Sequence, residues 1–492
     1  MEKYILSLDQ GTTSSRAVII NEKAQIVSIS QKEIRQIYPK EGWVEHDPME
    51  ILNSVIEVTE EVIEKLKIQP QQIKSIGITN QRETTVIWDK DTGIPIHNAI
   101  VWQDNRTITL CEKLKKQKLE KAISDKTGLV IEPYFSATKI KWLLDNDLSA
   151  KKQAKSGKLI FGNIDTWLIW NLTNKSTHAT DFSNASRTML FNIDTLKWDE
   201  DILEELDIPK TILPNVKDSN SHFGDFTYKG TKIPINGVLG DQQASLFGHM
   251  CFEKNSIKNT YGTGCFMLMN TGNKIIKSNN GLLSTIAWRI ENNISYSLEG
   301  SIFIGGAAIQ WLRDELGIIK TSDQSEKEAL KSTESKNLYM VPAFNGLGAP
   351  YWDMHATGLI IGITRDTNNS DIIKATLDSI AYQTKDVLIS MENDTGSKIK
   401  TLNVDGGASN NNYLMQFQSD ILGINITRPE NTEMTALGAG YIAGLKASFW
   451  DIDHLKTLNK NNTLFNHSYN INQIDDLYKK WKKAVHRSMN WI

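Results

Sequence analysis

Strand-like segments that end in an acidic turn occur three times in this chain of 492 residues. The turns are Asp9-Gln10-Gly11, Gly240-Asp241-Gln242 and Asp405-Gly406-Gly407, and each follows an apolar run. Strand-like and helix-like patterns alternate along the chain, which predicts an α/β fold. Two lobes that supply such loops to a shared cleft would explain the repetition. We place the boundary near residues 248–252 and predict lobes of residues 1–249 and 250–492.

Composition narrows the class of protein. The net charge is −3, so no basic excess indicates a nucleic-acid partner. The 3 cysteines are widely separated and form neither a disulfide framework nor a metal-ligand spacing. No apolar stretch approaches the roughly 20 residues of a membrane helix, and the N-terminal segment lacks the features of a secretory signal. We therefore expect a soluble cytoplasmic protein with no integral membrane segment.

The first acidic turn could bind a metal-bound polyphosphate. In this interpretation Asp9 faces the cation, the turn presents N–H and hydroxyl groups to phosphate oxygens, and Arg16 neutralises charge. An ordinary β-hairpin with a polar turn explains the same residues equally well. The familiar phosphate-binding patterns G-x-x-x-x-G-K-[ST] and G-x-G-x-x-G are absent in the contexts that they require.

Two further glycine-containing turns could contact a nucleotide. Tyr261–Phe266 places glycines on both sides of Thr263 between two strand-like segments. Asp405–Asn411 ends a strand with paired glycines and then opens a helix. Glycines in such turns let a phosphate, base or ribose approach the backbone closely. Each turn alone is a weak signal, but three at strand ends predict a common site.

Asp241 is the candidate general base for transfer of a phosphoryl group to a hydroxyl. An N-cap for a helix over Gln242–Phe247 is the structural alternative. The polar segment Asn80–Glu83, between two strands, could bind a small polyol or form a salt-bridged hairpin turn on the surface. Trp102 and Phe266 could form the apolar wall of a ligand site or belong to the core.

Long segments of the chain resemble the FGGY family of carbohydrate kinases. The family signatures are matched by Tyr134–Asn146 and by Gly358–Ile363 with Ala375–Asp378. The members that phosphorylate glycerol are matched at Gly42–Pro48, Thr79–Thr85 and Tyr261–Phe266. This resemblance, which covers nearly the whole chain, implies a two-lobed actin/hexokinase-like (ribonuclease H-like) ATPase fold with the active-site cleft between the lobes.

The resemblance also implies roles for individual residues. It makes Asp241 the base and assigns glycerol binding to Arg82, Glu83, Tyr134, Asp241 and Gln242, with Trp102 and Phe266 as the apolar wall. It assigns ATP binding to Thr12, Thr13, Ser14, Arg16, Thr263, Gly306, Gln310, Gly407 and Asn411. Asp9 and Asp241 would lie near Mg²⁺. The implied reaction converts glycerol and ATP to sn-glycerol 3-phosphate and ADP, and relatives associate into dimers or tetramers, so we expect a homo-oligomer.

Two other functions compete with this one. Another kinase of the same family could act on a longer polyol or a ketose such as a pentulose. A protein of a different class, an actin-like or chaperone-like ATPase without a small acceptor, would leave Tyr134 and the segment Asn80–Glu83 without a role. An acceptor-dependence assay separates these alternatives.

Overall fold

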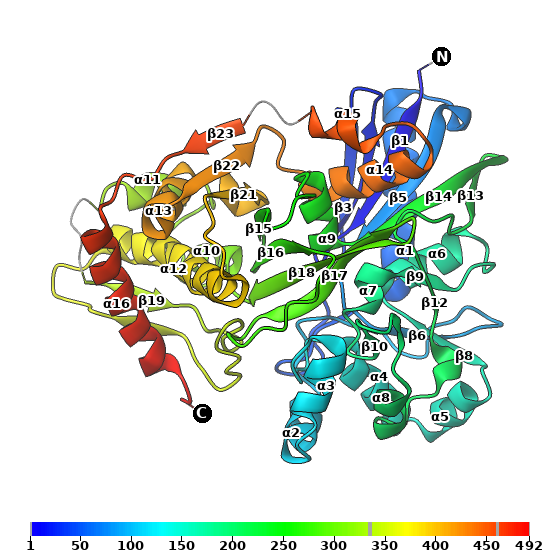
Figure 1. The fold of residues 1–492 in the computed structure, drawn as a ribbon, viewed down its shortest axis with the longest axis horizontal. Helices are drawn as coiled ribbons and strands as arrows, with labels where there is room; N and C mark the ends of the chain where they lie inside the picture. The colour runs from blue at the N-terminus through cyan, green and yellow to red at the C-terminus, as the bar shows by residue number, and fades with distance from the viewer. Residues whose placement is uncertain (1, 333–336, 459–461, 492) are drawn as a thin grey trace.

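The computed structural model describes residues 2–332, 337–458 and 462–491, which form two halves that are each built around a sheet (Figure 1). The sheet of the N-terminal half has six strands in the order β13-β14-β5-β1-β2-β3. Their bounds are β1 (Tyr4–Gln10), β2 (Ser14–Ile20), β3 (Ile26–Glu33), β5 (Ile73–Asn80), β13 (Asp225–Tyr228) and β14 (Thr231–Gly240).

The sheet of the C-terminal half has seven strands in the order β17-β18-β16-β15-β21-β22-β23. Their bounds are β15 (Ile257–Tyr261), β16 (Cys265–Gly272), β17 (Leu283–Ile290), β18 (Asn293–Ile302), β21 (Thr401–Asp405), β22 (Asn425–Pro429) and β23 (Asn462–Phe465).

The two sheets repeat one topology, which confirms the predicted two-lobed α/β organisation. In β3-β2-β1-β5-β14 two antiparallel pairings are followed by two parallel ones, and β18-β16-β15-β21-β22 has the same sequence of pairings. The acidic turns are not the repeated unit, however. They follow β1, β14 and β21, which are the third, fifth and fourth strands of this pattern. The two halves therefore share an order of strand pairing. A local sequence motif cannot indicate this order.

The remaining elements surround the two sheets, and the helices of residues 108–155 and 200–205 lie in the lower right part of Figure 1. In the N-terminal half they are β4 (Glu45–His46), α1 (Pro48–Leu66), β6 (Val86–Asp89), β7 (Ala99–Ile100), α2 (Ile108–Lys116), α3 (Glu120–Thr127), α4 (Ser136–Asn146), α5 (Leu148–Lys155), β8 (Leu159–Gly162), α6 (Ile164–Leu172), β9 (Ala179–Asp181), α7 (Phe182–Ala185), β10 (Phe191–Asn192), β11 (Lys197–Trp198), α8 (Glu200–Glu205), β12 (Asn215–Lys217) and α9 (Asp241–Gly248). In the C-terminal half they are α10 (Gly306–Asp314), α11 (Gln324–Ala329), β19 (Tyr339–Val341), β20 (Leu359–Ile361), α12 (Asn369–Thr395), α13 (Asn412–Leu422), α14 (Met434–Lys446), α15 (Ile452–Lys456) and α16 (Ile471–Ser488). Short 3-10 turns span Pro70–Gln72, Lys210–Ile212 and Gly407–Asn410.

Helix α14 joins the two halves, because it follows β22 in the chain yet packs on β1, β5 and β14 and against α9. Small residues permit this close approach. A Cβ added to Gly77 would lie 1.9 Å from the carbonyl oxygen of Ala439, and one added to Gly438 would lie 1.8 Å from that of Ala244. Larger side chains would push α14 away from the sheet and from α9, so the glycines hold the halves in register.

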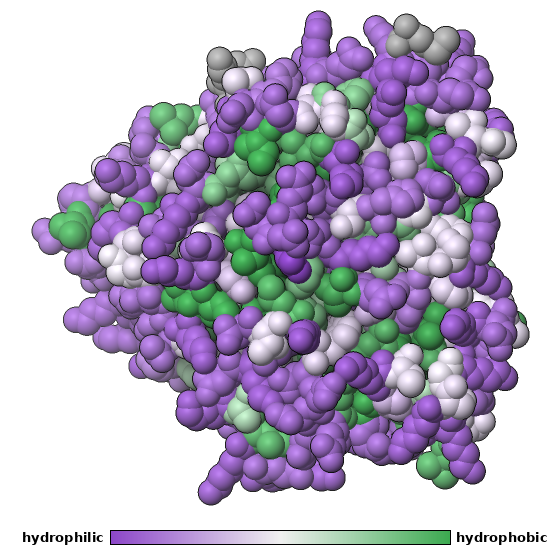
Figure 2. Space-filling view, turned by 45° about the vertical axis from the view of Figure 1, so that its right-hand side comes forward, coloured by the Kyte–Doolittle hydropathy of each residue, from purple (hydrophilic) through white to green (hydrophobic). Residues whose placement is uncertain are grey.

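The surface is mainly hydrophilic on the face drawn in Figure 2, and hydrophobic side chains gather towards its middle. One large hydrophobic cluster, which includes Ile5 and Val18 as well as Leu268 and Leu283, runs through both halves, and two others lie in the C-terminal and the N-terminal half. Among the residues that the structure describes, no helix combines the length and the apolar character that crossing a membrane requires.

Candidate active site

Three parallel strands of the N-terminal sheet end side by side and carry polar residues to one edge. Asn80 at the end of β5 pairs with Gln10 of β1 and with Gly240 of β14. Ligands of open α/β sheets bind at the carboxyl ends of such strands. The facing wall is the turn between β15 and β16. Between them lies a cleft with about 590 Å³ of empty space, open solvent included, and its lining consists of Thr12, Thr13, Arg82, Glu83, Trp102, Tyr134, Asp241, Gln242, Thr260, Gly262, Thr263, Gly264 and Phe266.

The segment Asn80–Glu83 is buried, so the surface hairpin turn that we considered for it is wrong. Strand β6, which follows the segment, pairs with β8 and not with β5. Arg82 and Glu83 are only 2% and 1% exposed. Glu83 also has a φ of +61°, an uncommon conformation for a residue with a side chain, which places it at the sharp bend after β5. Tertiary packing over the turn has converted a polar segment into the floor of the cleft.

The guanidinium group of Arg82 connects several groups of the cleft. Its Nε lies 3.1 Å from Oδ1 of Asp241. Its Nη1 and Nη2 donate to the two carboxylate oxygens of Glu299, at 2.6 and 2.8 Å. Nη1 also donates to Gln243, at 3.1 Å, and Nη2 to the hydroxyl of Tyr134, at 3.3 Å. The bidentate pairing with Glu299 fixes the plane of the guanidinium group.

Arg187 and Glu299 complete a buried network that our sequence reasoning missed. The Nε of Arg187 donates to Glu83 at 2.6 Å, and its Nη2 donates to Glu299 at 3.0 Å. Burial alone would raise the pKa of Glu299, but the guanidinium groups of Arg187 and Arg82 outweigh it and lower the pKa to about 2. The two positive charges of Arg82 and Arg187 therefore balance the two negative charges of Glu83 and Glu299. Glu299 is the one charged residue of β18, and this was the available sequence signal.

Asp241 is the first residue of α9, and Gly240 occupies the N-cap position, so the N-cap alternative for Asp241 is wrong. Its side chain is 26% exposed towards the cleft. Burial raises the pKa of this carboxyl above its usual value, and the charges of Arg82 and Lys258 oppose that shift. A carboxylate that is held by Arg82 yet open to the cleft can accept a proton from a bound hydroxyl.

Lys258 is a second residue that sequence reasoning missed. It is buried, and its Nζ donates to Oε1 of Gln242 at 2.6 Å and to Oγ1 of Thr260 at 2.7 Å. Burial lowers the pKa of Lys258 to about 8, against the opposing charges of Asp405 and Asp241. Lys258 lies within β15 and thereby fastens the start of α9 to the sheet of the other half.

The aromatic side of the cleft consists of Trp102, Tyr134 and Phe266. The ring centroids of Tyr134 and Phe266 each lie 5.7 Å from that of Trp102, in edge-to-face contacts. The indole N–H of Trp102 donates to Oγ1 of Thr12 at 2.9 Å. The wall is thus tied to the turn between β1 and β2.

Asp9 and Arg16 face each other across β1 and β2. Arg16 bonds to Glu433 as well, and its Nη1 lies 3.9 Å from Asp9. Burial raises the pKa of Asp9 to about 7, where Arg16 opposes the shift and Glu433 and Asp241 add to it. This excess of negative charge suits a divalent cation, because Mg²⁺ binds through one or two carboxylates together with substrate phosphates. Within the described ranges, no group of three or more His, Cys, Asp or Glu residues could hold a metal without such help.

The other predicted ATP contacts lie outside the lining of this cleft. Ser14 accepts a hydrogen bond from Gln31 at 3.0 Å. Gly306 begins α10 with Gln310 one turn later, and the N–H of Gly306 donates to the carbonyl of Gly262 at 2.9 Å. Gly407 faces open space, and Asn411 caps α13 through Leu414 at 2.9 Å. These residues stay predictions for nucleotide binding.

The third acidic turn differs from the other two, since its carboxylate turns inward. Asp405 accepts hydrogen bonds from Thr260 at 2.6 Å and from Ser245 at 2.9 Å. It therefore fastens α9 to β15. Only the backbone and the glycines of that turn are open to a ligand.

Two sheet-centred halves of one topology, with a polar cleft at the ends of their central strands, define a two-lobed sugar kinase fold. The chain belongs to the FGGY family of carbohydrate kinases. The N-terminal domain of this family matches residues 4–248 and the C-terminal domain matches residues 257–447.

Individual relatives agree with this assignment over their full length. The chain is 58% identical to a glycerol kinase of Thermoanaerobacter sp. (strain X514), with 100% of this chain and 99% of the relative covered. It superimposes on the crystal structure of Plasmodium falciparum glycerol kinase with ADP with a TM-score of 0.90 and 37% identity, and 99% of this chain and 98% of that chain are covered. A xylulose kinase from Lactobacillus acidophilus is 22% identical with a TM-score of 0.86 over 98% of this chain and 97% of that chain, which shows the shared fold alone.

Proposed function

We propose that the chain transfers the γ-phosphoryl group of ATP to a terminal hydroxyl of glycerol and releases sn-glycerol 3-phosphate and ADP. The observation that carries this proposal is the pair Arg82 and Asp241, in contact at 3.1 Å at the floor of a small cleft with one aromatic side. The similarity to proteins named glycerol kinase supports it over the full chain.

The acceptor site divides into a polar and an apolar face. Arg82, Glu83 and Tyr134 would bind the hydroxyl groups, while Trp102 and Phe266 pack against the carbon edge. Gln242, fixed by Lys258, would add a further hydrogen bond beside the reacting hydroxyl. Such a division suits a small polyol, which has hydroxyls along one side and C–H groups along the other.

Asp241 would accept the proton of the terminal hydroxyl as its oxygen bonds to the γ-phosphorus and the bond from that phosphorus to the β–γ bridging oxygen breaks. Because the transition state of phosphoryl transfer is loose, positioning and charge neutralisation dominate, and the base contributes about 10²–10⁴-fold. Thr12, Thr13 and Thr263 lie in the cleft lining where they could donate to phosphate oxygens. Ser14 and Arg16 lie beside them on β2.

Asp9 and Asp241 are the residues that would hold Mg²⁺, which neutralises phosphate charge when bound. Their carboxylates fit this role because they are close enough to interact, and the negative charges of Asp241 and Glu433 act on Asp9 against that of Arg16. Gly306, Gln310, Gly407 and Asn411 would contact the nucleotide from the C-terminal half. Exclusion of water from the cleft would protect ATP from hydrolysis.

The test is release of ADP in a coupled assay, without acceptor and with glycerol, xylulose or gluconate. We expect release that depends on glycerol and is weak with the other two. Equal release without any acceptor would instead indicate an ATPase, and preference for xylulose would indicate a pentulose kinase. We also propose a homo-oligomer in the cytoplasm, in line with the resemblance. Light scattering would determine the oligomeric state, and fractionation of cells the location.

A further inference from the structure

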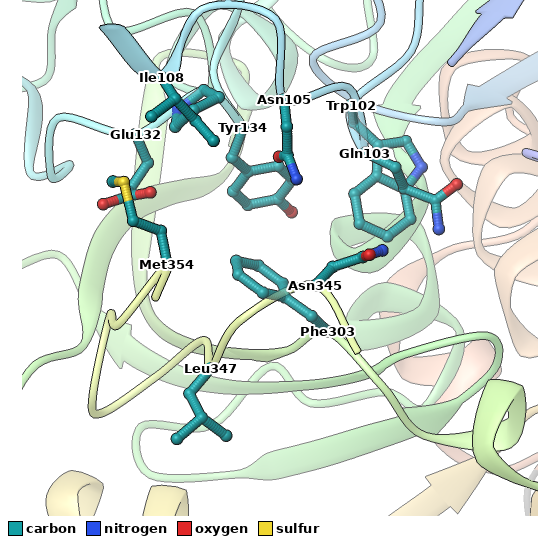
Figure 3. A pocket seen from close by; sticks show the side chains of 11 residues that line it. Trp102, Gln103, Asn105, Ile108, Glu132, Tyr134, Phe303, Asn345, Leu347 and Met354 are labelled. Carbon is teal, nitrogen blue, oxygen red and sulfur yellow. The ribbon is translucent and has the colours of Figure 1, made fainter. Parts of the chain in front are cut away.

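A second cavity lies directly behind the aromatic wall of the acceptor cleft (Figure 3). It contains about 570 Å³ of empty space, open solvent included. Trp102 and Tyr134 line both this cavity and the acceptor cleft. The N-terminal half supplies the rest of one side, and the C-terminal half supplies Phe303, Asn345, Leu347 and Met354. We call this cavity the rear chamber.

Three neutral carboxamides are among the polar groups that line the rear chamber. Gln103, Asn105 and Asn345 line the chamber, and the side chains of Asn105 and Asn345 reach the space between the rings of Tyr134, Trp102 and Phe303, whereas that of Gln103 points away from it (Figure 3). Among the residues that the structure describes, none of these three carboxamides has a hydrogen-bond partner, and no lysine or arginine lines the chamber. A carboxamide both donates and accepts, as a hydroxyl does.

The only carboxylate in this part of the lining is already neutralised. Glu132 accepts a hydrogen bond from Lys115 at 2.8 Å. The rear chamber therefore suits a neutral hydroxylated chain, and it offers a phosphorylated or otherwise charged one no counter-ion.

Trp102 separates the rear chamber from the acceptor cleft. The reacting hydroxyl must lie at Asp241. Arg82 contacts Asp241 through Nε and the hydroxyl of Tyr134 through Nη2, and Asp241, Tyr134 and Trp102 line the same cleft. A chain that extends away from Asp241 therefore meets Tyr134 and its neighbour Trp102. The indole is fixed there by its bond to Thr12 at 2.9 Å and is 9% exposed.

We propose that Trp102 limits the acceptor to three carbons, and that the rear chamber is a latent subsite for the distal hydroxyls of longer neutral polyols. This inference rests on the proposed function. Removing the indole joins two cavities that already share a wall. The carboxamides of Asn105 and Asn345 then face the fourth and later hydroxyls, so acceptor length depends on one side chain.

The experiment compares Trp102→Gly, Trp102→Leu and Trp102→Phe for kcat/KM on glycerol, erythritol, xylitol and sorbitol. Relative to glycerol, we expect kcat/KM on xylitol to rise at least about tenfold in Trp102→Gly, the lower end of what one methylene of pocket space contributes to discrimination. Trp102→Leu should show a smaller rise. Trp102→Phe, which retains a ring but no N–H, should leave the ratio within about threefold of wild type.

A second set of variants tests the rear chamber itself. In the Trp102→Gly background, Asn105→Ala with Asn345→Ala should remove the gain on xylitol without lowering activity on glycerol. Asn393→Ala is the matched control, because Asn393 is an exposed amide on α12, outside the lining of both cavities. Retention of the gain in the double-alanine variant would overturn the role of the chamber.

The outcomes separate this inference from the proposed function. A wild-type protein without glycerol-dependent ADP release would contradict the function itself. The inference alone would be overturned by a different result. In that case the wild-type protein phosphorylates glycerol, and ADP raises the melting temperature of Trp102→Gly and Trp102→Leu, but their kcat/KM on xylitol relative to glycerol is unchanged.

Discussion

The proposed acceptor side of the cleft is buried and charge-balanced, whereas the proposed nucleotide side is open. Arg82 and Glu83 are nearly inaccessible and bonded to Glu299 and Arg187, while Gln310 and Gly407 are exposed. Folding alone sets the geometry of the first side, and its charges are satisfied before any ligand binds. The second side presents backbone and glycines, so the nucleotide must supply the missing contacts. Substitutions on the acceptor side should therefore lower stability and acceptor binding, whereas substitutions on the nucleotide side should mainly raise KM for ATP.

The largest expected effect on catalysis comes from Asp241→Asn. The side chain keeps its shape but can no longer accept a proton, so kcat should fall by about 10²–10⁴-fold. The affinity for ADP in the absence of Mg²⁺, measured by calorimetry, should stay within about threefold, because the proposed contacts of Asp241 are with the acceptor and the metal and not with the nucleotide. Asp194→Asn, at an exposed position, is the control. Near-normal turnover of Asp241→Asn would remove Asp241 from the role of base.

Glu299→Ala should affect both stability and acceptor binding. It leaves Arg82 and Arg187 buried without their shared carboxylate, which costs about 3–5 kcal/mol of unfolding free energy. Urea titration measures this loss, and Glu205→Ala on the exposed face of α8 should stay within about 0.5 kcal/mol. We expect KM for glycerol to rise while KM for ATP changes little. An equal rise in both would contradict the separation of the two sides.

Two glycines sharpen the comparison on the nucleotide side. A Cβ on Gly306 would lie 2.6 Å from the carbonyl oxygen of Gly262, whereas one on Gly407 meets no atom within 4 Å. Gly306→Ala must shift the turn that carries Thr263, so we expect a cost of about 1–3 kcal/mol and a raised KM for ATP. Gly407→Ala should leave stability within about 0.5 kcal/mol and change only KM for ATP. Thermal melting with steady-state kinetics measures both.

Lys258→Met should give the smallest effect, one that depends on pH. Burial lowers the pKa of Lys258 to about 8 in the folded protein, against about 10.4 for an unperturbed lysine. Between these values the unfolded chain binds more protons than the folded one, so this lysine contributes stability that increases as pH rises. The unfolding free energy of wild type minus that of Lys258→Met should therefore increase by about 1 kcal/mol from pH 7 to pH 9. A difference that does not change with pH would show that Lys258 stays protonated.

Sequence patterns located several secondary-structure elements correctly. The apolar run before Asp241 predicted a strand that delivers this residue to its end, and β14 ends at Gly240. The start at Asp47-Pro48 predicted the helix that α1 forms over Pro48–Leu66. Both signals are local, since a strand end or a helix cap depends on residues within a few positions.

Other parts were beyond any local signal. Arg187 and Glu299 are 112 residues apart yet share a hydrogen bond, and neither belongs to a recognisable motif. Asp405 resembled Asp9 in its local sequence, but its carboxylate is buried against Thr260 and Ser245. Whether a polar side chain faces a ligand or another element depends on which strands pair, and strand pairing is a long-range property.

The sequence by itself determined the α/β class, the two lobes and, through its long matches, the family and the candidate residues. Only the tertiary structure decided how these residues are held. The parallel pairing of β1, β5 and β14 aligned their ends, and strand β18 of the other sheet brought Glu299 against Arg82 and Arg187. Packing also set Trp102 between two cavities. Burial then shifted the pKa values of the site's ionisable groups. A charge removed from water is destabilised unless a neighbouring opposite charge compensates for the loss.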